Sequence, residues 1–305
     1  MIRQVLLFLC AFCLSATLAA EQTRDYQVEL PASPDNAPGF TPPPESEIPD
    51  DQFGEMVRYG RDLFVNTQQL RGKYVGNDMN CVNCHVDAGR RADSAPLWAA
   101  YTMYPAYRKK NDRVNTMEER IQGCFRYSMN GSPPPSGSPE LTALITYHYW
   151  LAKGAPTGVA LEGRGYPKLD APEKKPDIRR GREVFQAQCA ICHGDDGMGR
   201  MAEGEVAFPP LWGEGSYNWG AGMHRVNTAA AFIHSNMPLG KPYSLSEQQA
   251  WDVAAYINSH ERPQDPRHEG DLKATDQTFH AHQCFYGDKI DGQALGTRSY
   301  PNPLE

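Results

Sequence analysis

The chain has no surplus of positive charge. Its 305 residues carry 30 Lys and Arg side chains against 37 Asp and Glu, a formal net charge of −7 at pH 7. General nucleic-acid-binding proteins carry a basic excess that neutralises phosphates, so this class is excluded and no nucleic-acid partner is expected. The 27 glycines and 25 prolines exceed average usage without reaching the level of disordered chains. We therefore expect a loop-rich fold with a buried core.

Long apolar runs are missing after residue 20. No later stretch approaches the ~18 consecutive apolar residues of a membrane-spanning helix, so no membrane span is expected. Before it, Arg3, the apolar run 5–14 and the small residues at 16–20 are typical of a secretory signal peptide. We expect residues 1–20 to be cleaved on export to the periplasm. Cys10 and Cys13 would leave with them, and six cysteines would remain.

Composition divides the rest of the chain. An acidic segment before residue 53 is interrupted by seven prolines, and it is either extended over a domain surface or disordered. A later segment rich in Gly, Pro and charge indicates a linker. The expected segments are the signal peptide (1–20), the acidic arm (21–52), domain 1 (53–152), the linker (153–178), domain 2 (179–265) and the C-terminal tail (266–305). We expect a solvated tail, and its His280, His282 and Cys284 leave a metal site as the alternative.

The two domains are copies of one another. Matching segments are Gly60-Arg-Asp-Leu-Phe64 and Gly181-Arg-Glu-Val-Phe185, Pro96-Leu-Trp98 and Pro210-Leu-Trp212, and Arg113-Val-Asn-Thr116 and Arg225-Val-Asn-Thr228. Each copy ends in a helical pattern that contains a tyrosine, Tyr147 or Tyr256. Such self-similarity predicts two tandem domains of one fold.

Apolar and polar residues do not alternate as they do in β-strands, so the fold class is mainly α. Helices are expected near 53–70, 117–129, 139–152, 178–189 and 245–259. Thr116 and Glu119 form a capping box before one of these helices, and Ser244 and Glu247 form one before another.

Each copy contains a C-x-x-C-H motif, Cys81-Val-Asn-Cys84-His85 or Cys189-Ala-Ile-Cys192-His193. This spacing suits covalent haem because two thiols reach two vinyl groups on one porphyrin edge and the adjacent histidine binds the iron. A zinc site or a redox dithiol is disfavoured for a motif repeated in an exported chain. We expect two covalently bound haem c groups, with His85 and His193 as iron ligands.

Each half resembles class I cytochrome c, with an N-terminal helix, the haem motif, a distal-ligand loop and a C-terminal helix. The resemblance implies two tandem class I cytochrome c domains. Met237 lies 44 residues after His193, where that family presents its distal methionine. Met237 is therefore the expected distal ligand of haem 2, and its rivals are Met198, Met201 and Met223.

The distal ligand of haem 1 is open at this point. Aligning the C-terminal helices places Met129 near the Met237 position, which would give a second His/Met haem. Cys124 lies five residues earlier, on an expected helix that puts Arg120 and Ser128 on the same face. Cys124 could instead be a small core residue or form a disulfide with Cys284.

A second resemblance bears on this choice. The segments Tyr104-Pro-Ala-Tyr107, Arg108-Lys-Lys110, Glu119-Arg-Ile-Gln-Gly-Cys124-Phe and Ser128-Met-Asn-Gly131 resemble the haem 1 region of dihaem thiosulfate dehydrogenases, also called tetrathionate synthases. The resemblance covers roughly residues 50–265. It implies that Cys124 is both the distal ligand of haem 1 and the catalytic centre.

The same resemblance implies an activity, the oxidation of two thiosulfates to tetrathionate or the reverse reduction. Electrons would pass from haem 1 to haem 2 and on to an acceptor such as a small periplasmic cytochrome c. Ten basic and six acidic residues between Arg71 and Arg126 favour an anionic substrate there. Arg120 and Lys110 are expected to hold the sulfonate ends, and Ser128 to hydrogen-bond near the sulfur.

Two other functions remain open from the sequence. A non-catalytic dihaem electron carrier would have His/Met ligation at both irons. A sulfur-oxidising cytochrome would conjugate thiosulfate to a carrier protein through a cysteine-ligated haem.

Overall fold

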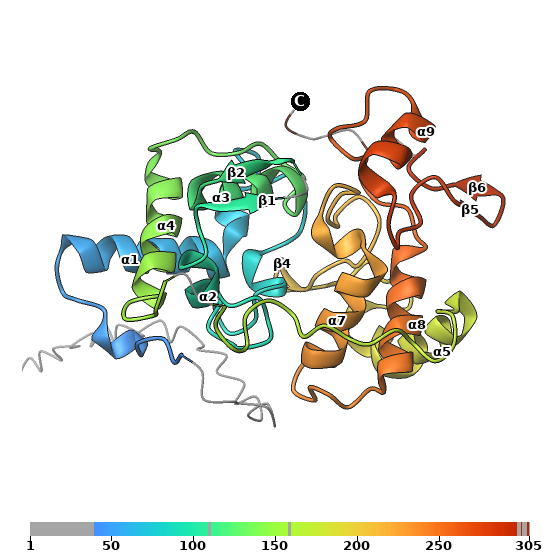
Figure 1. Ribbon diagram of the computed structural model, residues 1–305, viewed down its shortest axis with the longest axis horizontal. Helices are drawn as coiled ribbons and strands as arrows, with labels where there is room; N and C mark the ends of the chain where they lie inside the picture. The colour runs from blue at the N-terminus through green and yellow to red at the C-terminus, as the bar shows by residue number, and fades with distance from the viewer. Residues whose placement is uncertain (1–39, 109–110, 158–159, 298–299, 301–303, 305) are drawn as a thin grey trace, which may run out of the picture.

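Two helical domains lie side by side in the computed structural model, which describes residues 40–108, 111–157, 160–297, 300 and 304 (Figure 1). The expected signal peptide, most of the expected arm and Lys110 lie outside the described residues. The described part of residues 266–305, the C-terminal segment, packs beside domain 2. The mainly α class expected from the sequence is confirmed.

Domain 1 is built on helices α1 (Gln52–Val65), α2 (Leu97–Tyr101), α3 (Met117–Tyr127) and α4 (Pro139–Leu151), with 3₁₀ turns η1 (Glu45–Glu47), η2 (Thr67–Leu70) and η3 (Cys81–Asn83). Domain 2 contains α5 (Ile178–Gln188), α6 (Ala190–His193), the 3₁₀ turn η4 (Gly222–His224), α7 (Val226–Asn236) and α8 (Glu247–Asn258). The C-terminal segment adds α9 (Leu272–Thr275) and the π-helical turn η5 (Asp276–His280). Among the described residues, no helix is both long enough and apolar enough to cross a membrane.

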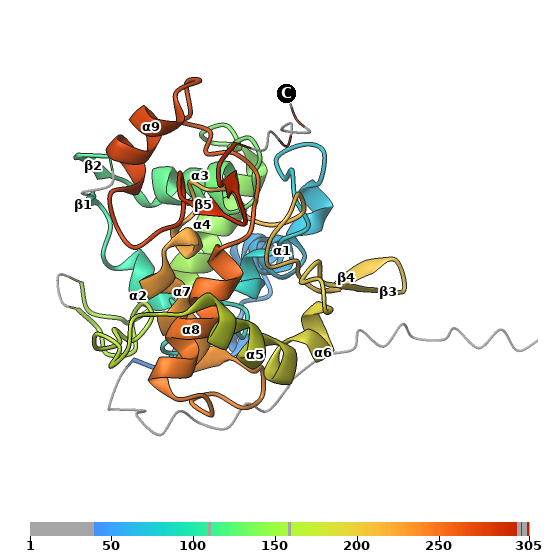
Figure 2. The same cartoon turned by 90° about the vertical axis from the view of Figure 1, so that its right-hand side faces the viewer.

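The described residues also form three short antiparallel strand pairs, and the sequence did not predict them. They pair β1 (Ala106–Arg108) with β2 (Arg113–Asn115), β3 (Arg200–Ala202) with β4 (Glu205–Phe208), and β5 (Lys289–Ile290) with β6 (Gln293–Ala294). The β3–β4 hairpin projects from domain 2 (Figure 2). Strands of two to four residues are too short to show an alternating pattern.

The same helix crossing holds each domain together. Helix α1 packs on α4, and α5 packs on α8 (Figure 2). A side chain at Gly60 would overlap the backbone oxygen of Ala143, and one at Gly181 would overlap that of Asp252. Glycine therefore allows the close approach of both helix pairs.

An aromatic contact also repeats. The rings of Phe64 and Tyr147 lie 6.0 Å apart, and those of Phe185 and Tyr256 lie 5.3 Å apart. All four rings are buried. The sequence repeat therefore reflects a repeat in packing.

The helix start predicted at Ser244 is wrong. The capping box of α8 joins Ser246 to Gln249, because the Ser246 hydroxyl accepts from the Gln249 N–H at 3.2 Å and the Gln249 side chain accepts from the Ser246 N–H at 2.9 Å. The Ser244 hydroxyl instead donates to the carbonyl of Lys241 at 2.7 Å. Both serines could cap the helix, but the hydroxyl of Ser244 is already bonded to the preceding turn, so Ser246 forms the cap.

The described end of the expected arm lies against domain 1. The ring of Phe40 is 5.7 Å from that of Trp98, and the Arg90 guanidinium donates to the carbonyl of Pro43 at 2.8 Å. Arg61 pairs with Glu45 at 2.7 Å. Residues 40–52 therefore add to the core of domain 1.

The solvated tail predicted for residues 266–305 is wrong for its described part. Tyr286 and Leu295 are 2 % and 5 % exposed and cover Trp219, which is fully buried. Tyr286 also donates from its hydroxyl to Gln264 at 2.9 Å. Domain 2 leaves an aromatic surface at Trp219, and the segment buries it.

Candidate haem 1 active site

A cavity of about 650 Å³ opens in domain 1. The attachment motif contributes Cys81, Cys84 and His85 to its lining, and helix α3 contributes Arg120, Cys124 and Ser128. The structure therefore brings together the described residues that were expected at this site. Lys110 lies outside the described residues.

His85 is held as a neutral imidazole. Its Nδ1 lies 2.7 Å from the carbonyl oxygen of Ala95, and because a carbonyl only accepts, Nδ1 carries the proton. Burial, and to a smaller extent the charge of Arg120, lowers the pKa of His85 to about 4. Nε2 keeps its lone pair for a metal at neutral pH.

Helix α3 positions the thiol and its cation. Its start is fixed by the predicted capping box, in which the Thr116 hydroxyl accepts from the Glu119 N–H and Glu119 accepts from the Thr116 N–H. One turn separates Arg120 from Cys124, and Arg120 Nη1 donates to Cys124 Sγ at 3.0 Å. The sulfur is also the main reason that the pKa of Arg120 is raised. A guanidinium at this distance stabilises negative charge on sulfur.

The structure excludes one alternative to Cys124 as an iron ligand, the disulfide, and leaves the other, Met129, within reach of the site. The disulfide with Cys284 is wrong, since the six described cysteines are unpaired and Cys284 Sγ lies 3.3 Å from His280 Nδ1 in another cluster. Met129 is 3 % exposed, belongs to the apolar core of domain 1 and also lines the cavity.

Several lining residues were missed from the sequence. Arg164 and Tyr166 come from the linker, and Tyr217 and Met223 come from domain 2. The Tyr166 hydroxyl donates to the Cys84 carbonyl at 3.0 Å. Contacts between domains leave no pattern along the chain, so the sequence could not predict these residues. The one local sign of them was an aromatic residue in a Gly- and Pro-rich linker.

His148 of α4 also lines the cavity and was missed. Its Nδ1 faces the Leu144 carbonyl at 2.7 Å, and burial lowers its pKa to about 4. His148 therefore adds a neutral, buried wall to the site.

The second motif repeats the arrangement around its histidine. His193 Nδ1 lies 2.9 Å from the carbonyl oxygen of Pro209, and burial lowers the pKa of His193. Met237 caps the end of α7, where its N–H donates to the Ile233 carbonyl at 2.9 Å, and it packs on the domain 2 core.

The linker and domain 2 form hydrogen bonds with one loop of domain 1, residues 93–95. The carbonyl of Asp93 accepts from Ser235 Oγ at 3.2 Å and from Asn236 Nδ2 at 3.0 Å. The Tyr243 hydroxyl donates to the Asp93 carboxylate at 3.0 Å. Backbone N–H groups of residues 93 and 95 donate to Gly163 and Gly165, each at 2.7 Å.

These residues fit covalent haem. In each domain a pair of thiols precedes a neutral histidine whose Nδ1 is anchored on a backbone carbonyl, and in domain 1 these groups share a cavity with a further thiol. Fold and motifs define a dihaem c-type cytochrome, with one covalently bound haem c in each domain.

Comparisons with known proteins identify the family. Residues 68–157 match the SoxA/TsdA cytochrome c domain, and residues 176–257 match the family of cytochrome c oxidase, cbb3-type, subunit III. A thiosulfate dehydrogenase of Stutzerimonas stutzeri is 53 % identical over 96 % of this chain and 98 % of its own length. A thiosulfate dehydrogenase of Thiomonas intermedia is 52 % identical over 97 % of this chain and 97 % of its own length. The chain belongs to the thiosulfate dehydrogenase family.

A solved structure agrees in fold. The thiosulfate dehydrogenase TsdBA of Marichromatium purpuratum, in its as-isolated form, is 53 % identical with a TM-score of 0.83. The match covers 85 % of this chain and 58 % of that longer one.

Proposed function

We propose that this chain is a periplasmic dihaem cytochrome that oxidises two thiosulfates to tetrathionate at haem 1. The observation that carries the proposal is the contact of Arg120 with Cys124, 3.0 Å apart in the cavity of the first attachment motif. The names of the relatives support the substrate. The signal pattern of residues 1–20 supports the location.

The proposed attachment and iron-binding residues follow from the motifs. Thioether bonds are formed by Cys81 and Cys84 in domain 1 and by Cys189 and Cys192 in domain 2. The proposed iron ligands are His85 and Cys124 for haem 1, and His193 and Met237 for haem 2. The bound haems supply one-electron acceptors that pass electrons to an external acceptor such as a small cytochrome c.

In the proposed reaction, Cys124 acts as a thiolate. It forms a bond to the sulfane sulfur of one thiosulfate, and this step releases two electrons and leaves a cysteinyl S-thiosulfonate. The sulfane sulfur of a second thiosulfate then attacks the bound sulfane sulfur, as in thiol–disulfide exchange. Tetrathionate leaves, and the Cys124 thiolate is restored without further electron loss. Reversal of both steps reduces tetrathionate with two electrons.

Positive charge in the cavity suits two dianions. Arg120 is proposed to stabilise the Cys124 thiolate and to hold a sulfonate, and Lys110 is proposed to hold the other sulfonate. Ser128 lines the same cavity and is proposed to donate to the sulfur under attack. Arg108 and Arg164 add two more cations to the lining.

The test compares two variants of the holoprotein in which both haems are verified. Thiosulfate-dependent reduction of ferricyanide, with tetrathionate quantified, is expected in the wild type and almost absent in Cys124→Ala. Met129→Leu is the matched control and should keep most of the activity. Equal rates in wild type and Cys124→Ala would remove the thiol from the mechanism.

Low-temperature EPR separates the enzyme from the electron carrier. A His/thiolate low-spin haem has a narrower spread of g values than a His/Met haem, so the wild type should show one narrow and one wide signal. Two wide signals without turnover would favour the carrier. Turnover that requires an added carrier protein would favour the conjugating cytochrome.

A further inference from the structure

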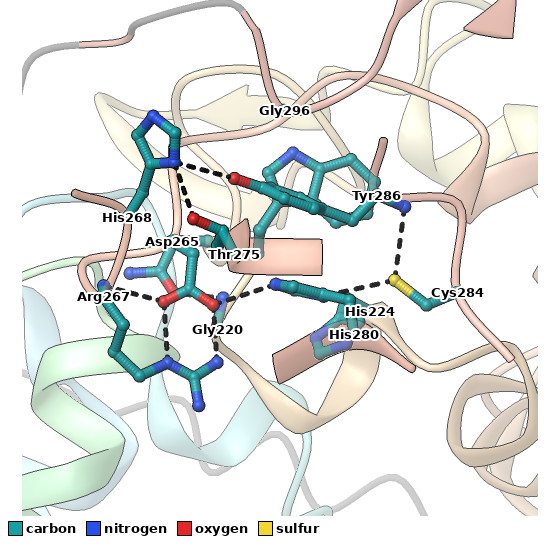
Figure 3. A network of polar contacts seen from close by, with 12 residues as sticks. Gly220, His224, Asp265, Arg267, His268, Thr275, His280, Cys284, Tyr286 and Gly296 are labelled. Atoms are coloured by element: carbon teal, nitrogen blue, oxygen red, sulfur yellow. Dashed lines mark hydrogen bonds and ion pairs between the residues drawn. The ribbon is translucent and has the colours of Figure 1, made fainter. Parts of the chain in front are cut away.

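A second cluster of metal-binding side chains lies where the C-terminal segment packs on domain 2 (Figure 3). His280, His282 and Cys284 come from that segment, and His224 ends the η4 turn of domain 2. One ligand atom of each residue lies within 4.8 Å of those of the other three. His224 and His280 are 1 % and 2 % exposed. Side chains from two distant segments thus converge on one small, buried volume.

Surrounding hydrogen bonds indicate the histidine tautomers. His224 Nδ1 faces the carbonyl oxygen of Ala221, which only accepts, so that nitrogen carries the proton. His280 Nε2 faces the carboxylate of Asp265 at 3.0 Å and carries its proton for the same reason. In each neutral ring the other nitrogen then offers a lone pair to a metal.

Those nitrogens face other ligand atoms of the cluster. His224 Nε2 lies 2.9 Å from His282 Nε2, and His280 Nδ1 lies 3.3 Å from Cys284 Sγ. The backbone N–H of Tyr286 donates to the same sulfur at 3.3 Å, a contact that stabilises thiolate charge. Each of these two side-chain contacts is a hydrogen bond, and a metal ion can take the place of the shared proton.

The supporting residues match those behind metal-bound histidines. Asp265 accepts from His280 and, at 2.9 Å, from Arg267 Nε (Figure 3). The Tyr286 ring stacks on His280 with centroids 4.1 Å apart. A carboxylate behind the imidazole fixes the ring and strengthens it as a ligand.

We propose that His224, His280, His282 and Cys284 bind one Zn²⁺ ion in a closed tetrahedral site. Four nitrogen and sulfur ligands from the protein are the usual set of a structural zinc site. Blue-copper sites use two histidines and a cysteine with a weak axial ligand such as a thioether. Binding deprotonates Cys284 and releases that proton to solvent.

The ion joins the C-terminal segment to domain 2. Among the described residues, Trp219, Tyr286 and Leu295 form the buried apolar cluster there, and a few partly buried side chains pack against it. So small a core holds a segment weakly without a metal or a disulfide. Met223, which precedes His224, lines the haem 1 cavity. The zinc site therefore also holds one wall of that cavity in place.

Metal analysis of the full-length protein with both haems tests the proposal. After incubation with Zn²⁺ and extensive dialysis, elemental analysis should give one zinc for every two irons, since the haem irons are an internal standard. His282→Gln and Cys284→Ser should each lose at least about four fifths of the zinc. His268→Gln is the matched control, because His268 lies in the same segment and bonds Thr275 and Tyr286 outside the cluster. The control should keep its zinc.

X-ray absorption at the zinc edge of the wild type tests the site without any variant. One sulfur at about 2.3 Å and three nitrogens at about 2.0–2.1 Å are expected around the ion. Zinc far below one equivalent, copper in its place, full zinc in Cys284→Ser or a zinc shell without sulfur would each overturn the proposal. Zinc far below one equivalent would leave the cluster as a hydrogen-bonded network, and the other outcomes would change its metal or its ligands.

Discussion

Four identical residues fold differently in the two domains. Arg113-Val-Asn-Thr116 forms strand β2 and then caps α3, whereas Arg225-Val-Asn-Thr228 enters helix α7. Glu119 completes the capping box of Thr116, but the matching position after Thr228 is Ala231. Alanine offers no acceptor for the N–H of the threonine, so Thr228 has no capping box and lies inside a helix that begins at Val226. The two copies thus differ both in the residue that would complete the cap and in where the helix begins.

The same alignment contrasts the distal walls. Arg120 matches Phe232, which is 8 % exposed and packs edge-on against Tyr166. Cys124 lies within α3, whereas Met237 lies at the end of α7. The repeat conserves the helix crossing that supports each haem motif. It differs at the matched helix positions, where Arg120 lines the haem 1 cavity and Phe232 packs on Tyr166 of the linker.

Giving domain 1 the methionine that domain 2 has as its proposed distal ligand should have the largest effect on activity. Cys124→Met is expected to lower thiosulfate oxidation by roughly a thousandfold or more, because it removes the nucleophile. Ferricyanide reduction with tetrathionate quantified measures the loss, and EPR should show two His/Met signals. A variant that kept a tenth of the rate would contradict the assigned role of the thiol.

Removing the positive charge of Arg120 tests the second difference between the domains, the cation beside the thiol. Arg120→Gln should lower kcat/KM for thiosulfate by about 10- to 100-fold, since it removes a charge-assisted hydrogen bond to sulfur and a contact to sulfonate. Arg126→Gln, an exposed arginine on the same helix, is the control and should change the value less than about twofold. Equal losses in both variants would point to general attraction of anions.

The shared helix crossing predicts equal losses of stability. Gly60→Ala and Gly181→Ala should each lower the free energy of unfolding of their domain by about 3 kcal/mol, because the new methyl group meets backbone. Gly123→Ala has nothing within 4 Å of the new methyl group and should raise it by about 0.5–1 kcal/mol. Denaturant titration followed by circular dichroism measures all three. A much smaller loss at one crossing would show that the two are not equivalent.

An ion pair between an exposed lysine and a buried glutamate predicts the smallest effect. Lys73 donates to Glu140 at 2.7 Å, and this bond is the main reason that the pKa of Glu140 is lowered. Glu140→Gln should cost about 0.5 kcal/mol at pH 7, since Lys73 is largely exposed. The pair stabilises fully above the unfolded pKa of glutamate, about 4.3, and this stabilisation is lost as pH falls through the lower folded pKa. A difference that persisted unchanged in acid would assign the effect to packing.

Local signals predicted a large part of the molecule. The capping box at Thr116, the proline after Ser138 and the two attachment motifs all depend on residues close in sequence. The helix face that joins Arg120 to Cys124 follows from helical spacing alone. This is why the wall of the cavity that α3 provides was predictable.

The remaining features depend on contacts between distant segments. Tyr166 of the linker bonds the Cys84 carbonyl, and Met223 enters the cavity from domain 2. Tyr286 is buried because Trp219 lies beneath it. Composition favoured a solvated tail, since nothing near residue 286 reveals an aromatic surface in domain 2.

The loop at residues 93–95 has a consequence for electron exchange between the domains. Its Ala95 carbonyl orients His85, while its Asp93 carbonyl holds Ser235 and Asn236, next to Met237. A spacer of three residues therefore links the regions of the two proposed iron-binding sites. Electron exchange need not wait for the domains to reorient, so its rate should not fall as glycerol raises the viscosity of the solvent.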